Sequence, residues 1–170
     1  MSVAGWRSLA AGAVGVGILV GCAGAHPEPG AYLVRSKGYR VVPPAGWERI
    51  PSDADLALRQ PILGAGLMAH ATCEGKTPGR PLPLLARHLR FGLKDVADLQ
   101  ETPAAVAGRP ALRSRFTARL DGVPVAVEAV TLAGSRCVYD LVAVAPPATL
   151  AAVTPDLDRF AESLRLGVDP

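Results

Sequence analysis

The fold depends most on residues 112–131, which read LRSRFTARLDGVPVAVEAVT. Apolar side chains alternate with other residues on both sides of Asp121 and Gly122. This period of two is typical of β-strands. An Asp-Gly pair favours a two-residue hairpin turn, because both turn positions take a positive φ. The stretch therefore predicts an antiparallel β-hairpin.

The register of this hairpin follows from the position of its turn. A two-residue turn places Phe116 opposite Val127 on the face that we expect to be buried. The same register places Arg115 opposite Glu128 on the other face, where opposite charges favour the pairing. An earlier hairpin is expected to turn at Gly108-Arg109.

Shorter apolar runs separated by Pro and Gly predict further strands. They cover residues 39–42, 47–50, 56–60, 66–73 and 137–145. The last run is apolar on both faces apart from Asp140, which is typical of a central strand covered on both sides. Asp140 has two interpretations. It is a polar group satisfied at a strand end or by a nearby Arg, or it is a functional carboxylate.

A mid-chain helix is expected to begin at Pro81 or Pro83. Apolar residues then recur at spacings of three and four, which indicates one buried face. They are Leu82, Leu85, Leu89, Leu93 and Val96. The basic residues Arg87, Arg90 and Lys94 lie off that stripe, on a face that is either solvated or directed at anionic lipid.

A C-terminal helix is expected to begin at Pro155, with Thr154 as its cap and Asp156 in its first turn. Its buried stripe is expected to contain Leu157, Phe160, Ala161 and Leu164. Strands followed by helices in this order indicate an α+β domain.

The part of the chain from Gly38 to Leu166 resembles the PsbP/Mog-like superfamily, which includes a photosystem accessory subunit, a Ran-binding protein and DcrB-like envelope lipoproteins. The resemblance rests on the mid-chain helix, on the hairpin turn and on short motifs. These motifs are Gly38-Tyr39-Arg40-Val41, Pro44, Gly46-Trp47, Asp121-Gly122 and Phe160 with Ser163-Leu164. It implies an antiparallel β-sheet flanked by helices on both faces, an α/β/α sandwich, and a binding or accessory role. It transfers no binding residue, so the binding site stays unknown.

The N-terminus resembles the lipobox of bacterial lipoprotein precursors. Residues 19–22 read LVGC, after the single charge Arg7 and an apolar run too short to span a bilayer comfortably. The resemblance implies cleavage between Gly21 and Cys22 and a diacylglycerol on the Cys22 thiol. An uncleaved anchor and an ordinary secretory signal are the alternatives.

The expected organisation is a signal peptide over 1–21, a flexible tether over 22–31 and one α+β domain over 32–170. Ala23 follows the lipidated position, and by resemblance to Gram-negative lipoproteins the lack of Asp there favours the outer membrane, with the domain facing the periplasm. The inner membrane and the cell surface remain alternatives.

The two downstream cysteines, Cys73 and Cys137, are expected to form a disulfide, because such bonds persist in exported domains. Two buried free thiols are the alternative. No metal site is predicted, since His70 is the only imidazole near these cysteines. No cofactor is predicted either.

Composition and motifs argue against several functions. A formal charge of +3 and an aromatic content of 5% do not favour nucleic-acid binding. Sequence motifs for phosphate loops, nucleophile elbows and zinc helices do not occur. A triad of Ser114, His70 and Asp140 can be drawn, but Ser114 lies on the expected core face, and Cys73 and His70 suit a nucleophile pair poorly.

The sequence therefore predicts a non-enzymatic envelope module that is held to the membrane by its lipid and binds a protein or lipid partner. A small-ligand carrier is one alternative. A hydrolase of unknown substrate is the other.

Overall fold

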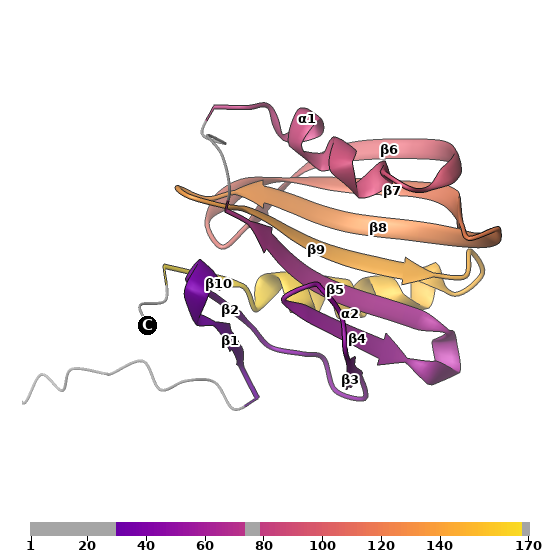
Figure 1. The fold of residues 1–170 in the computed structure, drawn as a ribbon, viewed down its shortest axis with the longest axis horizontal. Coiled ribbons are helices and arrows are strands. Elements are labelled where there is room, and N and C mark those ends of the chain that lie inside the picture. The colour runs from indigo at the N-terminus through magenta and orange to yellow at the C-terminus, as the bar shows by residue number, and fades with distance from the viewer. Residues whose placement is uncertain (1–29, 74–78, 168–170) are drawn as a thin grey trace, which may run out of the picture.

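The computed structural model describes residues 30–73 and 79–167, and its main element is a seven-stranded antiparallel sheet. The strands lie in the order β3-β4-β5-β9-β8-β7-β6 (Figure 1). Their bounds are Glu48–Ile50 for β3, Leu56–Gln60 for β4, Ala65–Thr72 for β5, Lys94–Val106 for β6, Arg109–Leu120 for β7, Val123–Ala133 for β8 and Val138–Ala145 for β9.

A second, three-stranded sheet contains β1 (Tyr32–Val34), β2 (Tyr39–Val41) and β10 (Arg165–Leu166), with β2 in the middle. The 3₁₀-helix η1 (Arg35–Lys37) joins β1 to β2. Tyr39 and Val41 are buried in the main core, so this small sheet belongs to the same packing unit as the large one.

Helices cover the two faces of the large sheet unequally. Helix α2 (Leu150–Glu162) crosses one face and contacts β9, β8 and β5. The short helix α1 (Leu82–Ala86) and the 3₁₀-helix η3 (Arg87–Arg90) lie on the opposite face, where α1 contacts β7 and β8 (Figure 1). The predicted fold class, an antiparallel sheet with helices on both faces, is confirmed.

The predicted register of the β7–β8 hairpin is confirmed. Phe116 lies opposite Val127 and Arg115 lies opposite Glu128. Glu128 is 3% exposed, because its face of the sheet packs against α2 and both faces of the sheet are covered at this point. Its ion-pair partner is Arg113 on the diagonal, with Nη1 2.6 Å from Oε1.

The earlier hairpin, between β6 and β7, is present, but its turn lies one residue before the predicted position. Val106 pairs with Arg109, so Ala107 and Gly108 form the turn and Arg109 already belongs to the strand. Both turn residues have positive φ, 51° and 69°. The prediction that Arg109 lies in the turn was wrong, because the left-handed conformation begins at Ala107.

Strand β6 forms one edge of the large sheet. Its pairing with β7 shifts register twice, between Lys94 and Gln100. Asp95 and Asp98, which lie in that interval, have positive φ of 51° and 54°. The strand also contains Pro103, which has no amide hydrogen.

The mid-chain helix is shorter than the leucine spacing predicted. Helical structure ends at Arg90, and Lys94 and Val96 belong to β6. Gly92 takes a positive φ of 81° and turns the chain toward the sheet, which a continuous helix does not allow. The predicted basic face therefore does not exist as one helical surface.

The C-terminal helix begins at Leu150 rather than at Pro155, so the predicted Thr154 cap was wrong. Proline inside a helix removes one backbone hydrogen bond. Here the carbonyl that loses its donor belongs to the exposed residue Ala151, where water can replace the donor. The predicted stripe of Leu157, Phe160, Ala161 and Leu164 is buried.

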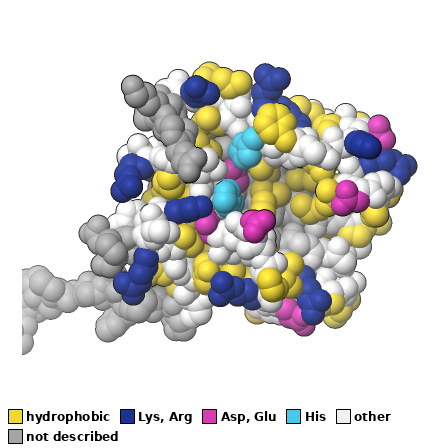
Figure 2. Space-filling view, in the orientation of Figure 1, with side chains coloured by type: hydrophobic (Ala, Val, Ile, Leu, Met, Phe, Trp, Pro, Cys, Tyr) yellow, Lys and Arg dark blue, Asp and Glu magenta, His cyan; other side chains and the backbone are white. Residues whose placement is uncertain are grey.

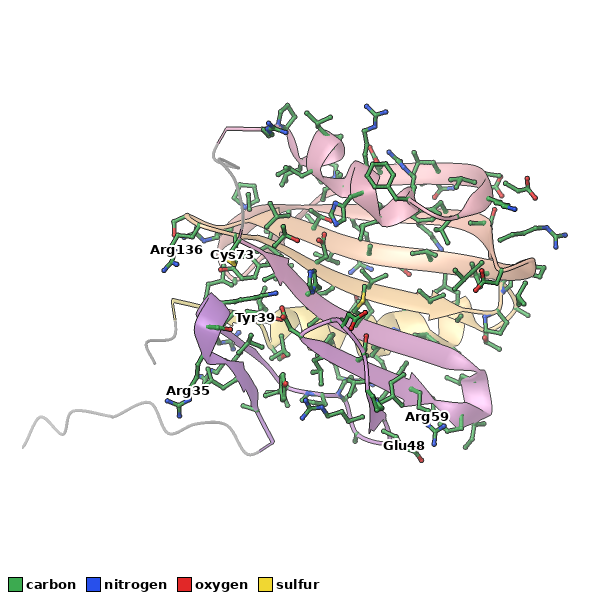
Figure 3. All side chains as sticks on the ribbon, in the orientation of Figure 1. Arg35, Tyr39, Glu48, Arg59, Cys73 and Arg136 are labelled. Carbon is green, nitrogen blue, oxygen red and sulfur yellow. A yellow bond between two sulfur atoms is a disulfide. The ribbon has the colours of Figure 1, made fainter. Side chains whose placement is uncertain are left out.

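The predicted disulfide joins Cys73 and Cys137, whose Cα atoms are 4.0 Å apart. It links the end of β5 to the start of the central strand β9, and Cys73 is labelled in Figure 3. The amide of Gly134 donates to the carbonyl of Cys137 at 2.8 Å, which closes the turn between β8 and β9.

The predicted cleavage and lipidation residues, Gly21 and Cys22, lie outside the described residues. Within 30–73 and 79–167, no helix has the length and apolar character needed to span a bilayer.

Candidate functional site

The face of the sheet that carries α1 contains an apolar groove of about 460 Å³. Its floor consists of side chains from β5, β9 and β8. Its walls consist of residues that follow α1, of residues 52–54 in the loop before β4, and of Leu120 at the end of β7. Floor and walls include Met68, Val142, Val127, Leu89, Phe91 and Leu93. Figure 2 shows apolar side chains in this hollow beside the two histidines.

The groove exists because the covering segment is narrower than the sheet. Alternation in β8 and β9 places Val127 next to Val144 on one face, and the same face continues to Met68 on β5. Helix α1 and η3 cover only part of this apolar surface. Phe91 at the rim is 80% exposed, and Leu120 at the open end is 44% exposed. A contiguous exposed patch of this kind typically marks a binding surface.

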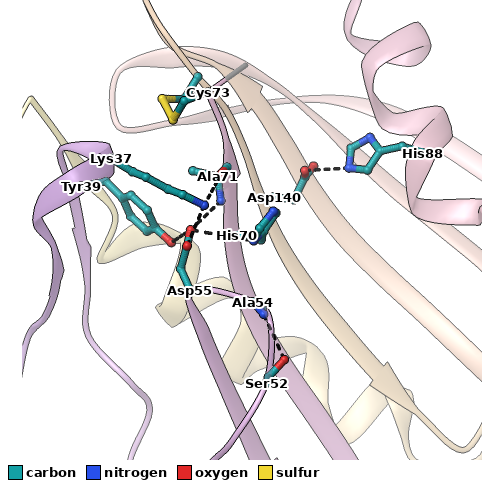
Figure 4. A network of polar contacts seen from close by, with 11 residues as sticks. Lys37, Tyr39, Ser52, Ala54, Asp55, His70, Ala71, Cys73, His88 and Asp140 are labelled. Atoms are coloured by element: carbon teal, nitrogen blue, oxygen red, sulfur yellow. Dashed lines mark hydrogen bonds and ion pairs between the residues drawn. A yellow bond between two sulfur atoms is a disulfide. The ribbon is translucent and has the colours of Figure 1, made fainter. Parts of the chain in front are cut away.

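Asp140 lies at the polar end of the groove and is 1% exposed. Thr131 Oγ1 donates to its Oδ1 at 2.7 Å, and His88 Nε2 donates to its Oδ2 at 2.9 Å (Figure 4). Asp140 is therefore a satisfied polar group, as one of its two interpretations held, but its partners are Thr131 and His88 and not an Arg. It is the third residue of β9, opposite His70 on one side and Thr131 on the other.

His88 has an acceptor oxygen at each ring nitrogen. Nδ1 lies 2.5 Å from the carbonyl oxygen of Leu85, and Nε2 faces Asp140. Both contacts are hydrogen bonds only when both nitrogens carry a proton. The hydrogen bond with Asp140 accordingly raises the pKa of His88 above its usual value, against partial burial, which lowers it. The geometry therefore favours an imidazolium that joins η3 to the sheet.

A second polar cluster, beside the groove, surrounds Asp55. Its carboxylate accepts hydrogen bonds from the Tyr39 hydroxyl at 2.8 Å and the Ala71 amide at 2.7 Å, and Lys37 Nζ lies 2.7 Å away. Burial alone raises the pKa of Asp55, but the hydrogen bonds from Lys37 and Tyr39 outweigh it and lower the pKa. His70 Nδ1 lies 3.9 Å from Asp55 (Figure 4).

The Asp55 cluster joins the small sheet to the large one. Burial, together with the hydrogen bond to Asp55, raises the pKa of Tyr39 so far that the phenol stays protonated and remains a donor. Three donors thus satisfy one carboxylate, which gives the cluster a structural role.

The structure does not assemble the triad that could be drawn from the sequence. Ser114 is buried, lies outside the groove lining, and its Oγ has no hydrogen-bond partner among the described residues. Cys73 is bonded to Cys137. His70 and Asp140 do lie opposite each other, and both line the groove.

His88 is the site residue that the sequence reasoning missed. It lies within the stretch predicted as one long helix, and its partner Asp140 lies 52 residues further along the chain. The local signal in the sequence was an imidazole directly beside Leu89, in a leucine-rich segment that also contains Arg87 and Arg90. The resulting site offers an apolar floor, and its polar groups include the His88–Asp140 ion pair, Asp53 and His70. The apolar floor is suited to binding an apolar group.

Among the described residues, no group of three or more His, Cys, Asp or Glu side chains has the geometry to hold a metal ion.

No protein-family model matches this chain. No curated protein matches it either. A protein from Bacteroides thetaiotaomicron is similar in structure, with 7% identity and a TM-score of 0.56 over 80% of this chain. The chain spans about half of that protein, 47% of its length.

Two further solved structures are similar over most of their length. Cyanobacterial PsbP (CyanoP) from Synechocystis sp. PCC 6803 matches with 12% identity and a TM-score of 0.57, covering 85% of this chain and 98% of its own. LpqN, involved in cell envelope biogenesis of Mycobacterium tuberculosis, matches with 15% identity and a TM-score of 0.54. The match covers 75% of this chain and 82% of LpqN. At these identities the likeness concerns the fold alone, and the chain has a PsbP-like fold.

Proposed function

We propose that this chain is a lipid-anchored protein of the cell envelope that acts as a non-catalytic binding or accessory module. The groove beside η3 is the observation that carries the proposal, because it presents apolar surface that the fold itself does not use. The partner is a protein or a lipid, which inserts an apolar group into the groove.

The envelope location rests on the lipobox-like residues 19–22 and on Ala23, which favours the outer membrane with the domain facing the periplasm. The Cys73–Cys137 disulfide is consistent with an exported domain. The similarity to LpqN adds an analogy, since that protein is involved in cell envelope biogenesis.

The non-catalytic role rests on how the reactive side chains are used. Asp140 and His88 neutralise each other, and the Asp140 carboxylate also accepts from Thr131. Ser114 lies outside the groove. A nucleophile needs a base within hydrogen-bond reach and access to substrate, and Ser114 has neither among the described residues.

Photo-crosslinking in living cells tests the proposal. A photoreactive benzoylphenylalanine replaces Phe91 at the rim of the groove. In a matched control it replaces Ile62, which is 91% exposed and lies in the 3₁₀-helix η2 (Pro61–Leu63), outside the groove lining. Both side chains are large, apolar and exposed, so neither substitution disturbs the core.

A defined adduct at position 91 that is absent at position 62 supports the proposal, and its mass separates a protein partner from a lipid. Equal labelling at both positions, or labelling at neither, contradicts a specific partner at the groove.

A small-ligand carrier is the second candidate, favoured by the size of the groove. Its volume of about 460 Å³ lies within the range of about 300–1,000 Å³ that is typical of ligand sites. In that case a small molecule should leave the purified protein on denaturation and appear by mass spectrometry, and the adduct at position 91 should contain that molecule.

A further inference from the structure

The molecule has a second cavity, of about 520 Å³, which shares no lining residue with the groove. Leu120, at the end of β7, lines the groove, whereas Arg109, at the start of β7, lines the second cavity, so the two lie toward opposite ends of this strand. The second cavity lies between the start of β7, the turn that joins β8 to β9, and β10. Its lining includes Arg109, Ser135, Tyr139, Arg165 and Gly167. Figure 3 labels Arg136 and Cys73 at this end of the molecule.

Positive charge converges on this cavity. Arg109 and Arg165 line it. Burial raises the pKa of the neighbouring Tyr139, and the positive charges of Arg109 and Arg136 oppose that rise without cancelling it. Among the residues the structure describes, no carboxylate lines the cavity, and none lies within 4.0 Å of a nitrogen of these three arginines. Within residues 30–73 and 79–167, no carboxylate therefore neutralises their charge.

The guanidinium of Arg165 is held in place by the backbone. Its Nη1 donates to the carbonyls of Glu162 at 2.7 Å and Leu164 at 3.0 Å. The strand that carries it is in turn fixed by the amide of Gly167, which donates to the carbonyl of Gly38 at 2.9 Å. Arg165 keeps its other nitrogens for a ligand and loses little side-chain freedom on binding.

The opposite wall of the cavity is also fixed. A Cβ on Gly134 would lie 2.8 Å from a ring carbon of Tyr139 and 3.5 Å from its hydroxyl, so the ring packs closely on the turn. The same turn is closed by the bond from Gly134 to Cys137, which is covalently joined to Cys73. The disulfide thereby anchors the segment that carries Arg136.

We propose that this cavity binds the phosphate group of an anionic ligand. The planar fork of an arginine matches two oxygens of a phosphate, and a phosphate has further oxygens for a second arginine and for a hydroxyl donor such as that of Tyr139. The phosphate belongs to a free phosphorylated compound or to a phospholipid headgroup. The chemistry at the cavity is the same for both.

Titration of the purified full chain in neutral detergent tests the proposal. One arm uses inorganic phosphate, and the other uses glycerophosphoglycerol, the water-soluble headgroup of phosphatidylglycerol, both at constant ionic strength. Amide shifts of Gly134, Ser135 and Gly167 in two-dimensional nuclear magnetic resonance spectra report binding at the cavity.

The test variant is Arg109→Gln/Arg165→Gln. The matched control is Arg87→Gln/Arg115→Gln, which removes the same charge from two exposed arginines outside the cavity. Affinity should fall by at least about tenfold in the test variant, because each charged hydrogen bond contributes about that factor. It should stay within about twofold in the control.

A free phosphorylated ligand is supported if inorganic phosphate causes saturable amide shifts in the wild type and the control variant but not in the test variant. Saturable shifts with the headgroup alone, again lost only in the test variant, support a phospholipid. Shifts that do not saturate with either probe, or an equal loss of affinity in the test and control variants, overturn the proposal.

Discussion

His88 connects the segment that covers the groove to the sheet beneath it, through acceptors at both of its ring nitrogens. When the ring loses a proton, one nitrogen presents a lone pair to an acceptor oxygen, and that contact becomes repulsive. The buried carboxylate of Asp140 then keeps Thr131 as its donor. The attachment of η3 therefore depends on pH.

The variant His88→Gln should be destabilised most at low pH. The folded state raises the pKa of His88, so the imidazolium contributes its stability fully below the unfolded pKa of about 6.5, and the contribution is lost as the pH rises through the folded pKa. The difference in free energy of unfolding between wild type and variant should shrink as the pH rises from about 6.5 through the raised folded-state pKa of His88. Urea denaturation at a series of pH values measures this difference.

Asp140→Asn provides the control for this prediction. In that background the cost of substituting His88 should depend much less on pH, because the hydrogen bond to the Asp140 carboxylate, the largest cause of the raised pKa of His88, is gone. A wild-type difference that stays constant with pH would contradict the imidazolium assignment.

The sequence singled out Asp140 but not its partner, and the reason is physical. A single carboxylate in a strand that is apolar on both faces stands out locally. The position of His88 depends instead on how far the preceding helix continues and where the chain then turns. That is decided by packing across the sheet and by Gly92, not by the spacing of leucines.

The β7–β8 hairpin was predictable because its information is local. Turn chemistry at Asp121 and Gly122 fixes the register, and the alternation of side chains supports the same register. The helices were harder to predict. Leu89 and Leu93 are spaced as on one face of a helix, and both pack against the same apolar cluster. Helical structure nevertheless ends at Arg90, before Leu93, so the spacing of leucines alone did not show where the helix ends.

Replacing Gly122 with Val should destabilise the domain by about 1 kcal/mol or more. Gly122 has a φ of 83°, which a β-branched residue adopts only with strain, and a Cβ added there would meet nothing within 4 Å. The cost therefore comes from the backbone alone. Thermal or urea unfolding measures it.

Gly122→Asn is the matched control, because Asn tolerates the left-handed region. It should lose clearly less stability than Gly122→Val. Equal losses for the two variants would mean that the turn does not depend on positive φ at this position.

The two faces of the large sheet differ in what covers them. Helix α2 lies against the larger core, whereas α1 and η3 leave the groove open on the other face (Figure 1). The resemblance from Gly38 to Leu166 predicted the layers but not the groove. The groove depends on the width of a short covering segment, which is a property of tertiary packing.

Removal of the disulfide should lower the free energy of unfolding by up to about 4 kcal/mol, the loop-closure value for Cys73 and Cys137 at a separation of 64 residues. Urea unfolding with and without a reductant measures the loss. The variant Cys73→Ala/Cys137→Ala should not respond to reductant, and a wild type that responds no more than this variant would contradict the stabilising role.

The variant Cys22→Ala should lose its lipid and its processing by the lipoprotein peptidase. Mass spectrometry of the membrane fraction should find wild-type protein that begins at Cys22 and carries acyl chains, since two or more chains hold a protein stably on a bilayer. Cys73→Ala is the control that keeps the anchor. An intact wild-type N-terminus, or a mature wild-type chain without lipid, would disprove the anchor.

The irregular strand β6 matters most where many copies of the protein lie close together. An unpaired strand edge invites another chain to add to it, and anchoring at one membrane raises the local concentration of such edges. The two register shifts and Pro103 interrupt the row of amides that an incoming strand needs. At the opposite edge, β3 has three residues and offers little to pair with. Aggregation by edge-to-edge strand addition is thus opposed at both sides of the large sheet, a protection that the proposed membrane anchor makes more important.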